Sequence, residues 1–480
     1  MLFNSIQFLI FFTIVTTLFF VLKHKYRWMM LLLASCIFYI SFIPIYIIIL
    51  AVLILIDYTA GIYIEKSSGK KRKLFLLISI LSTATVLFIF KYFNFFNANL
   101  SQLASFIHWN YSIGALYLIL PVGLSFHTFQ SLSYVIEVYM GRQKAEKNLG
   151  IYSLYVMFYP QLVAGPIERP QNLLHQFYEE HKFDITKFVE GLQLMLWGFF
   201  LKIVIADRLA PIVNAVYNNI HAYTGIPLII STYFFAFQIF CDFAGYSIIA
   251  IGCARVMGFK LMDNFKRPYF SKSIAEFWRR WHISLSTWFK DYVYIPLGGN
   301  RVSKARNIMN IMIVFLISGL WHGAAWTFLI WGGLHGLYRV ISIKTDNFRK
   351  KFCDFIRLSR FPKIHTLIKI FITFNLAALG WIFFRANNLS DAFYVITHLF
   401  KSWNLDFLKD NLVFGKTSLI MIFFLILFME SVHYIQEKRG VRNFWSRIPP
   451  YLRMIIYIIF ILIILLFGIF GNTQFIYFQF

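Results

Sequence analysis

The chain has 480 residues, of which 59% are hydrophobic and only 14% are charged, and its formal net charge is +25. Soluble domains carry roughly 25% charged residues, so this composition excludes an ordinary soluble protein and indicates an integral membrane protein. The positive charge does not indicate nucleic-acid binding, because the basic residues lie in short clusters between apolar segments, at 23–27, 70–73, 142–147, 301–306, 344–363 and 438–453.

Long apolar runs follow one another from end to end. They lie at 8–22, 28–40, 45–63, 74–90, 113–139, 191–205, 226–256, 308–320, 324–341, 364–384, 418–431 and 454–470. A helix that spans the bilayer needs about 20 residues, and fewer where it is short or tilted. The pattern predicts an all-α polytopic fold of about 11–12 transmembrane helices, with re-entrant or interfacial helices around a central cavity. We expect a single integral-membrane domain over residues 1–480.

The distribution of charge predicts an orientation. Short basic loops beside membrane spans stay in the cytoplasm, whereas the loops at 94–112 and 386–415 are nearly neutral, which fits the opposite side. Together they place the N-terminus outside. The first apolar run has basic residues after it and none before it, the reverse of a cleaved signal peptide, so we expect a retained span.

Two early segments interrupt the apolar pattern. In 120–141, residues 127, 130, 131, 134 and 138 share one helical face, which either lines a polar cavity or makes hydrogen bonds to neighbouring helices. Segment 158–170, FYPQLVAGPIERP, holds three prolines and cannot continue a helix. It is either a re-entrant turn covered by protein or a loop at the surface.

Two later polar groups also allow two interpretations each. Asp242, within the apolar run at 226–256, is a candidate partner for a histidine or an arginine, or lies at the membrane interface. Arg385 ends the run at 364–384, either as an interfacial anchor or on the path of an anionic substrate. The cysteines, Cys36, Cys241, Cys253 and Cys353, show no CxxC spacing and are expected to be small buried hydrophobes.

Residues 273–291, SIAEFWRRWHISLSTWFKD, carry the strongest local signal for a helix. Ser273 and Glu276 have the spacing of a capping box. Aromatic and apolar residues then recur at helical spacing, with Arg279 and Arg280 off that stripe. The pattern is typical of an amphipathic helix in the membrane interface. His282 lies on the aromatic face, where the transmembrane bundle is expected to begin.

The stretch at 316–338, LISGLWHGAAWTFLIWGGLHGLY, is almost wholly apolar, yet it contains His322 and His335. An ionisable side chain at membrane depth is costly and marks a functional site by default. His322 lies between Trp321 and Gly323, so one side is shielded by an aromatic ring and the other is left open. We expect His322 to be a general base in a dry but accessible pocket, since burial keeps an imidazole neutral. A structural role, in which His322 only hydrogen-bonds a neighbouring helix, is the alternative.

Five stretches in order resemble the membrane-bound O-acyltransferases, and more closely their bacterial alginate O-acetyltransferase branch. They are LPVGLSFHTFQSLSYVIEVY at 120–139, FYPQLVAGPIERP at 158–170, RRWHISLSTWFKDYVYIPLGGNR at 279–301, WHG at 321–323 and GWIFFRANNLSDA at 380–392. They define a motif-bearing core at 120–392, with flanking spans at 1–119 and 393–480. The branch that transfers D-alanine to teichoic acid resembles the chain in the same motifs.

The resemblance implies a multi-pass enzyme of the bacterial cytoplasmic (inner) membrane. Such enzymes move an acyl group, in this branch usually acetyl, from a cytoplasmic thioester to hydroxyls of an exported polysaccharide, commonly with an extracytoplasmic partner of the SGNH-esterase type. His322 matches the essential histidine of the family and His282 its second functional histidine. Only the resemblance separates His322 from His335.

The residues themselves suggest how a donor would be held. If the donor is acetyl-CoA, its phosphates need cations, and those available near the cytoplasmic mouth are Lys272, Arg279, Arg280 and Arg301. Anionic lipid headgroups would attract the same residues. No HExxH, serine-elbow or Walker motif is present, so zinc-protease, hydrolase and ATPase functions have no support. The acyltransferase hypothesis includes no metal and no bound prosthetic group. A transporter with histidines that relay protons is the rival function.

Overall fold

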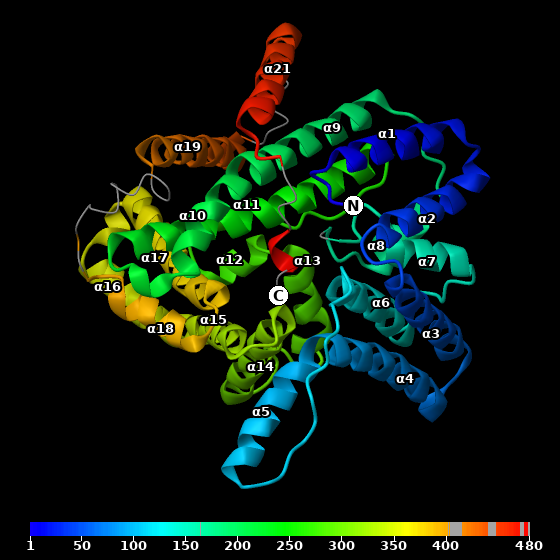
Figure 1. Ribbon diagram of the computed structural model, residues 1–480, viewed down its shortest axis with the longest axis horizontal. Helices are drawn as coiled ribbons and strands as arrows, with labels where there is room; N and C mark the ends of the chain where they lie inside the picture. Colours follow the sequence, from blue (N-terminus) through cyan, green and yellow to red (C-terminus); the bar gives the residue numbers. More distant parts are fainter. Residues whose placement is uncertain (164, 402, 404–414, 440–447, 471–474, 479–480) are drawn as a thin grey trace. The chain divides into compact units, whose positions relative to one another are not determined.

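The computed structural model describes residues 1–163, 165–401, 403, 415–439, 448–470 and 475–478 (Figure 1). Within these residues the secondary structure is helical and contains no strand, which confirms the predicted fold class. The neutral loop at 386–415 and the basic cluster at 438–453 fall partly outside the described residues.

The chain forms two compact units. The first comprises residues 1–195 and 246–263, and the second comprises residues 196–245 and 264–480. Two helices, α9 (Ile185–Phe199) and α11 (Ile226–Val256), contribute residues to both. The single domain expected over 1–480 stays a prediction.

The helices of the first unit precede α9. They are α1 (Ile6–Val21), α2 (His24–Ile40), α3 (Tyr46–Lys66), α4 (Gly69–Leu87), the π-helix η1 (Phe88–Tyr92), α5 (Phe93–Phe106), α6 (Leu124–Tyr139), α7 (Leu149–Met157), α8 (Pro170–Leu173) and the 3-10 helix η2 (Leu174–Phe177). Helices α3, α4 and α6 pack against one another.

The second unit begins with the π-helix η3 (Phe200–Ala206), α10 (Asp207–Tyr217) and η4 (Ile220–Ala222). After α11 come η5 (Pro268–Phe270), α12 (Ile274–Arg280), α13 (Ile283–Phe289), η6 (Lys290–Tyr294), α14 (Lys304–His322), α15 (Trp326–Lys344), α16 (Asp346–Phe355), η7 (Leu358–Arg360), α17 (Pro362–Arg385), α18 (Leu389–His398), α19 (Lys416–Arg439), α21 (Pro450–Phe467) and η9 (Ile476–Phe478). Helices α14 and α15 lie side by side (Figure 1).

Seven helices among the described residues are long and apolar enough to cross a membrane, so the protein is a multi-pass membrane protein. They are Tyr46–Lys66, Gly69–Phe106, Ile185–Tyr217, Ile226–Val256, Pro362–Arg385, Lys416–Glu437 and Pro450–Phe467. Other predicted spans form shorter or less apolar helices, namely α1, α2, α14 and α15.

The apolar run at 113–139 differs from the prediction, because its helix begins only at Leu124. Gly123, which directly precedes α6, has a φ of 74°. Glycine adopts this left-handed conformation readily, whereas other residues rarely do, and the conformation is not that of an α-helix. A Cβ there would lie 2.6 Å from the carbonyl oxygen of Leu162, so a glycine also permits close contact with the following loop.

The polar residues of α6 bind neighbouring helices, so the interhelical interpretation of 120–141 holds. The Ser131 hydroxyl donates to the carboxylate of Asp57 in α3, and the Ser79 hydroxyl of α4 donates to the same carboxylate. The side-chain amide of Gln130 donates to the carbonyl of Tyr155 in α7. These bonds satisfy polar groups that the bilayer would leave unpaired.

Segment 158–170 is a turn covered by protein, not a surface loop, since nearly all of its described residues are buried. Glu168 is fully buried, and one of its carboxylate oxygens accepts the backbone N–H of Met262. The Tyr155 hydroxyl donates to the Glu168 carbonyl at 2.9 Å. Burial raises the pKa of Glu168 to about 7.

Candidate active site

The site is built on the hairpin of α14 and α15 in the second unit. Ser303 caps α14, its hydroxyl accepting the N–H of Arg306, and the helix ends at His322. The two helices approach through glycines. A Cβ at Gly319 would lie 2.3 Å from the Phe328 carbonyl oxygen, and a Cβ at Gly332 would lie 2.3 Å from that of Phe315. Small residues allow this close packing in membrane proteins, and the packing places His322 at the turn of the hairpin.

His322 is 3% exposed and is surrounded by aromatic rings. Its ring centroid lies 4.8 Å from those of Trp321 and Trp331, 5.3 Å from that of Phe384 and 5.7 Å from that of Tyr477. The expected dry environment is therefore present. Little of the imidazole surface is exposed to solvent among the described residues. The access for a substrate that the sequence analysis expects stays a prediction.

His282 lies at a break between two short helices, so the single helix predicted over 273–291 is wrong. Its φ of 43° is left-handed, which ends α12 and starts α13 in a new direction. Asn264 holds the new turn: its carbonyl accepts the N–H of Ile283, and its side-chain oxygen accepts the Ser284 hydroxyl at 2.9 Å. The predicted cap is present, since the Ser273 hydroxyl accepts the N–H of Glu276.

The break turns the His282 ring into the interior, where it is 0% exposed. The ring lies 4.6 Å from the centroid of Phe243 and 6.0 Å from that of Trp321, which also contacts His322. Burial lowers the pKa of His282 to about 3. The imidazole is thus neutral at physiological pH and suits hydrogen bonding better than acid catalysis.

His335 is a packed core residue. Its Nδ1 accepts the indole N–H of Trp278 at 3.3 Å. Its Nε2 has no hydrogen-bond partner among the described residues and abuts Gly380, where a Cβ would lie 2.9 Å away. The Trp331 ring separates it from His322, with centroids 5.0 Å and 4.8 Å from the two histidines. His335 is thus packed against Trp278, Trp331 and Gly380.

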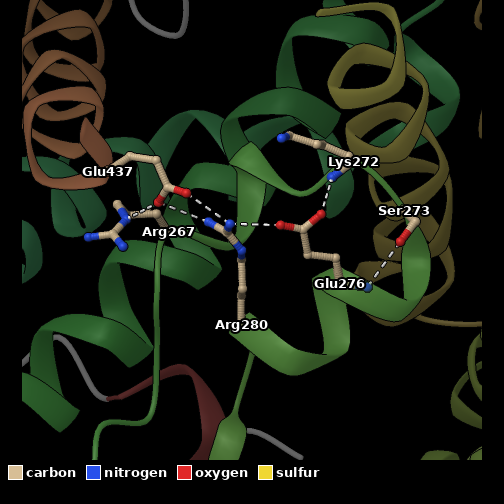
Figure 2. Close-up of polar contacts among 6 residues, drawn as sticks. All are labelled: Arg267, Lys272, Ser273, Glu276, Arg280 and Glu437. Atoms are coloured by element: carbon tan, nitrogen blue, oxygen red, sulfur yellow. Dashed lines mark hydrogen bonds and ion pairs between the residues drawn. The ribbon is translucent and has the colours of Figure 1, made fainter. Parts of the chain in front are cut away.

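The basic residues expected to hold the donor differ in their exposure and in their ion pairs. Lys272, Arg279 and Arg301 are exposed. Figure 2 shows the guanidinium of Arg280 between two carboxylates, 2.7 Å from Glu276 and 2.9 Å from Glu437. Arg280 therefore fastens α12 to α19.

The environment of Arg280 is completed by neighbouring contacts (Figure 2). Arg267 also pairs with Glu437, at 2.7 Å. Lys272 contributes its backbone N–H to the Glu276 carboxylate at 2.9 Å, while its exposed ammonium stays available. The expectation that lipid or donor phosphates meet these cations thus applies best to Lys272, Arg279 and Arg301.

The structure also shows what the two later polar groups contact. The partner of Asp242 is neither a histidine nor an arginine but Lys202, at 2.6 Å. Arg385 donates to the side-chain oxygens of Asn214 at 2.9 Å and Asn218 at 3.0 Å. These bonds tie the end of α17 to α10. The two interpretations of Arg385, an interfacial anchor and a place on a substrate path, stay predictions.

Sequence reasoning missed the C-terminal residues of the site. Tyr477, in η9, contacts the rings of His322, Phe243 and Phe384, with centroids 5.7, 4.4 and 6.2 Å away. It is partly exposed, unlike the histidine it covers. Its surroundings in the sequence, FIYFQF, read as the end of an apolar run. Nothing in that pattern indicates a contact across 155 positions.

The model of the membrane-bound O-acyltransferase family matches residues 142–385, which contain His282, His322 and His335. The chain is 36% identical to the probable alginate O-acetylase AlgI of Pseudomonas aeruginosa, over 89% of this chain and 81% of that protein. It is 34% identical to the peptidoglycan O-acetyltransferase of Helicobacter pylori, over 76% of this chain and 72% of that protein. It is 32% identical to the teichoic acid D-alanyltransferase of Streptococcus thermophilus, over 55% of this chain and 68% of that protein. The helical membrane fold, the buried histidines and these matches agree: the chain belongs to the membrane-bound O-acyltransferase family and is an acyltransferase.

Proposed function

We propose that the protein moves an acetyl group from a cytoplasmic thioester, acetyl-CoA, to hydroxyl groups of an exported or cell-surface polysaccharide. Its location is the bacterial inner membrane with the N-terminus outside, and an SGNH-type extracytoplasmic protein completes the transfer. The observation that carries this proposal is the position of His322, buried among aromatic rings at the end of α14. The similarity to two kinds of O-acetyltransferase supports acetyl as the group transferred.

The reaction requires two proton transfers, one to His322 and one from it. The acceptor hydroxyl gives its proton to the neutral imidazole of His322 as its oxygen attacks the thioester carbonyl. The tetrahedral intermediate then collapses, the carbon–sulfur bond breaks, and the imidazolium returns the proton to the leaving thiolate. Water must be kept away, because it would compete with the acceptor hydroxyl. The aromatic rings that enclose His322 serve this exclusion.

His282 acts beside His322 in this proposal, as a neutral group that orients a substrate or donates to the oxyanion. The ring of Trp321 contacts both histidines, so His282 and His322 are neighbours of the same aromatic side chain. No metal and no bound prosthetic group takes part in the proposed mechanism. Transfer of D-alanine to teichoic acid is the second candidate, since a D-alanyltransferase is among the relatives. The transporter alternative loses its support to the family membership.

Membranes that contain the protein, supplied with acetyl-CoA labelled in the acetyl group, test the proposal. Label should pass to polysaccharide or to a protein partner, and His322→Gln membranes should show no such transfer. Label on the polymer without prior label on a protein would make the sugar the first acceptor. Transfer from a D-alanyl thioester, with none from acetyl-CoA, would establish the second candidate instead.

The exposed arginines give a prediction about the donor. If Arg279 and Arg301 hold donor phosphates, Arg279→Gln and Arg301→Gln should each raise the KM for acetyl-CoA about tenfold or more and leave kcat nearly unchanged, since a charge-assisted hydrogen bond contributes about 1.5–3 kcal/mol. Steady-state kinetics in detergent checks this.

Arg280→Gln is the matched control, because Arg280 is held between Glu276 and Glu437. It should lower the melting temperature and leave the KM for acetyl-CoA unchanged. An unchanged KM in Arg279→Gln and Arg301→Gln, together with weaker binding to anionic vesicles, would assign these residues to lipid headgroups.

A further inference from the structure

A buried cluster of charged side chains lies in the second unit. The ammonium of Lys202, in η3, is 2.8 Å from a carboxylate oxygen of Asp207 and 2.6 Å from one of Asp242. The three residues are 1%, 3% and 3% exposed. Buried charges in a membrane protein are costly unless they are paired and hydrogen-bonded. Since one cation serves two carboxylates here, the cluster needs further donors.

One such donor comes from the C-terminal end of the chain. The backbone N–H of Ile476 donates to the second carboxylate oxygen of Asp242 at 2.7 Å. Asp242 thus uses one oxygen for Lys202 and the other for η9. The bond is made inside the protein, because Ile476 is 5% exposed and its neighbour Phe475 is 0% exposed.

The chain just before this segment, at 467–469, is hydrogen-bonded to η3 and α10. The N–H of Ile469 donates to the carbonyl of Ile203, within η3, at 2.9 Å. The guanidinium of Arg208, in α10, donates to the carbonyl of Phe467. A π-helix widens the helical turn and is often found at functional sites. Here the π-helix η3 supplies both Lys202 and the carbonyl that receives Ile469.

The C-terminal segment at 475–478 contributes a side chain to the candidate active site. Tyr477 follows Ile476 directly, and its ring lies 5.7 Å from that of His322. Phe243 follows Asp242 directly, and it contacts both Tyr477, at 4.4 Å, and His282, at 4.6 Å. If Asp242 moves, its chain neighbour Phe243, which contacts His282, is displaced. The hydrogen bond to Ile476 is displaced too, and with it Tyr477, which contacts His322.

We propose that Lys202 and Asp242 are positioning residues, which hold the C-terminal segment against His322 through the N–H of Ile476. This inference rests on the proposed function of His322. Lys202 orients the Asp242 carboxylate through their contact at 2.6 Å, and Asp242 fixes the backbone that presents Tyr477. A purely structural cluster would instead join η3, α10 and α11 and would not affect the C-terminal segment.

Asp207 provides the matched control, since it pairs with the same lysine, whereas the N–H of Ile476 donates to Asp242. We would compare Asp242→Asn with Asp207→Asn, and Asp242→Ala with Asp207→Ala, in the full-length protein. Each pair removes one carboxylate from the same lysine. Hydrogen exchange of the C-terminal peptide, followed by mass spectrometry, reports the hydrogen bond of Ile476 without requiring any activity.

The Asp242 variants should exchange the Ile476 amide about tenfold faster or more, as expected when a local hydrogen bond opens. Their kcat should fall by about 10–100-fold with little change in the KM for the donor, because small misplacement of catalytic groups lowers kcat strongly. Asp242→Asn retains one oxygen that can accept from Ile476 and should recover part of the loss. The Asp207 variants should leave both exchange and kcat near wild type, even where the melting temperature falls.

Two results would overturn the inference. One is unchanged exchange at Ile476 in both Asp242 variants. The other is an equal loss of kcat in the Asp242 and Asp207 variants that follows their loss of melting temperature. If exchange accelerates as expected but acetyl-CoA is no substrate, the anchor stands and the proposed donor fails, so the two failures are distinguishable.

Discussion

Replacing His322 by glutamine should lower acyl transfer by roughly 10²–10⁴-fold, the contribution of a well-placed general base. Glutamine is neutral and of similar length, so the surrounding rings of Trp321, Trp331 and Phe384 can stay in place. The loss should appear in kcat, because the proton is removed only as the acceptor attacks. Transfer of labelled acetyl groups at saturating donor measures it, and thermal unfolding followed by size-exclusion chromatography shows that the variant is folded.

His335→Gln is the comparison that gives this result its meaning. His335 accepts a hydrogen bond from Trp278 and packs against Gly380, so its replacement should lower the melting temperature more than the activity of the protein that remains folded. If His335→Gln abolished transfer at an unchanged melting temperature, while His322→Gln kept about a tenth or more of the activity, the base would be His335 instead.

Gly332→Ala should prevent the α14–α15 hairpin from closing, the largest effect on folding that we expect. A Cβ at this position would lie 2.3 Å from the carbonyl oxygen of Phe315 and 3.1 Å from the Cα of Gly319. Both are backbone atoms, so the helices themselves must separate. Overpacking costs about 1–3 kcal/mol where side chains can adjust, and more is expected here. The yield of monodisperse protein and its melting temperature would fall sharply.

Gly333→Ala is the control, one position along the same helix. Its Cβ would meet only Leu316, at an ordinary distance of 3.7 Å from Cδ2. Alanine is favoured over glycine within a helix by about 0.8–1.0 kcal/mol, so this variant should be as stable as wild type or slightly more stable. Equal behaviour of the two alanine variants would contradict the close approach of α14 and α15.

Several site features could be predicted because they depend on neighbours in sequence. The cap at Ser273 spans three residues, and the capping bond is present. The dry surroundings of His322 follow from an apolar stretch that also supplies Trp321 and Trp331. The break at His282 could not be predicted from this spacing, because the aromatic residues recur at helical positions on both sides of it. The left-handed backbone there is held by Asn264, a residue outside the periodic pattern.

Composition, periodicity and spacing within single segments predict the apolar helices, the membrane environment, the family resemblance and a histidine within an apolar stretch. Contacts between distant parts of the chain could not be predicted in this way and follow from the folded arrangement. There Asp242 meets Lys202, Arg280 lies between two carboxylates, Trp278 donates to His335 and Tyr477 lies beside His322. The physical reason is that hydropathy places a residue in an apolar environment but does not choose its neighbours. Close helix approach at glycines and the pairing of buried charges make that choice.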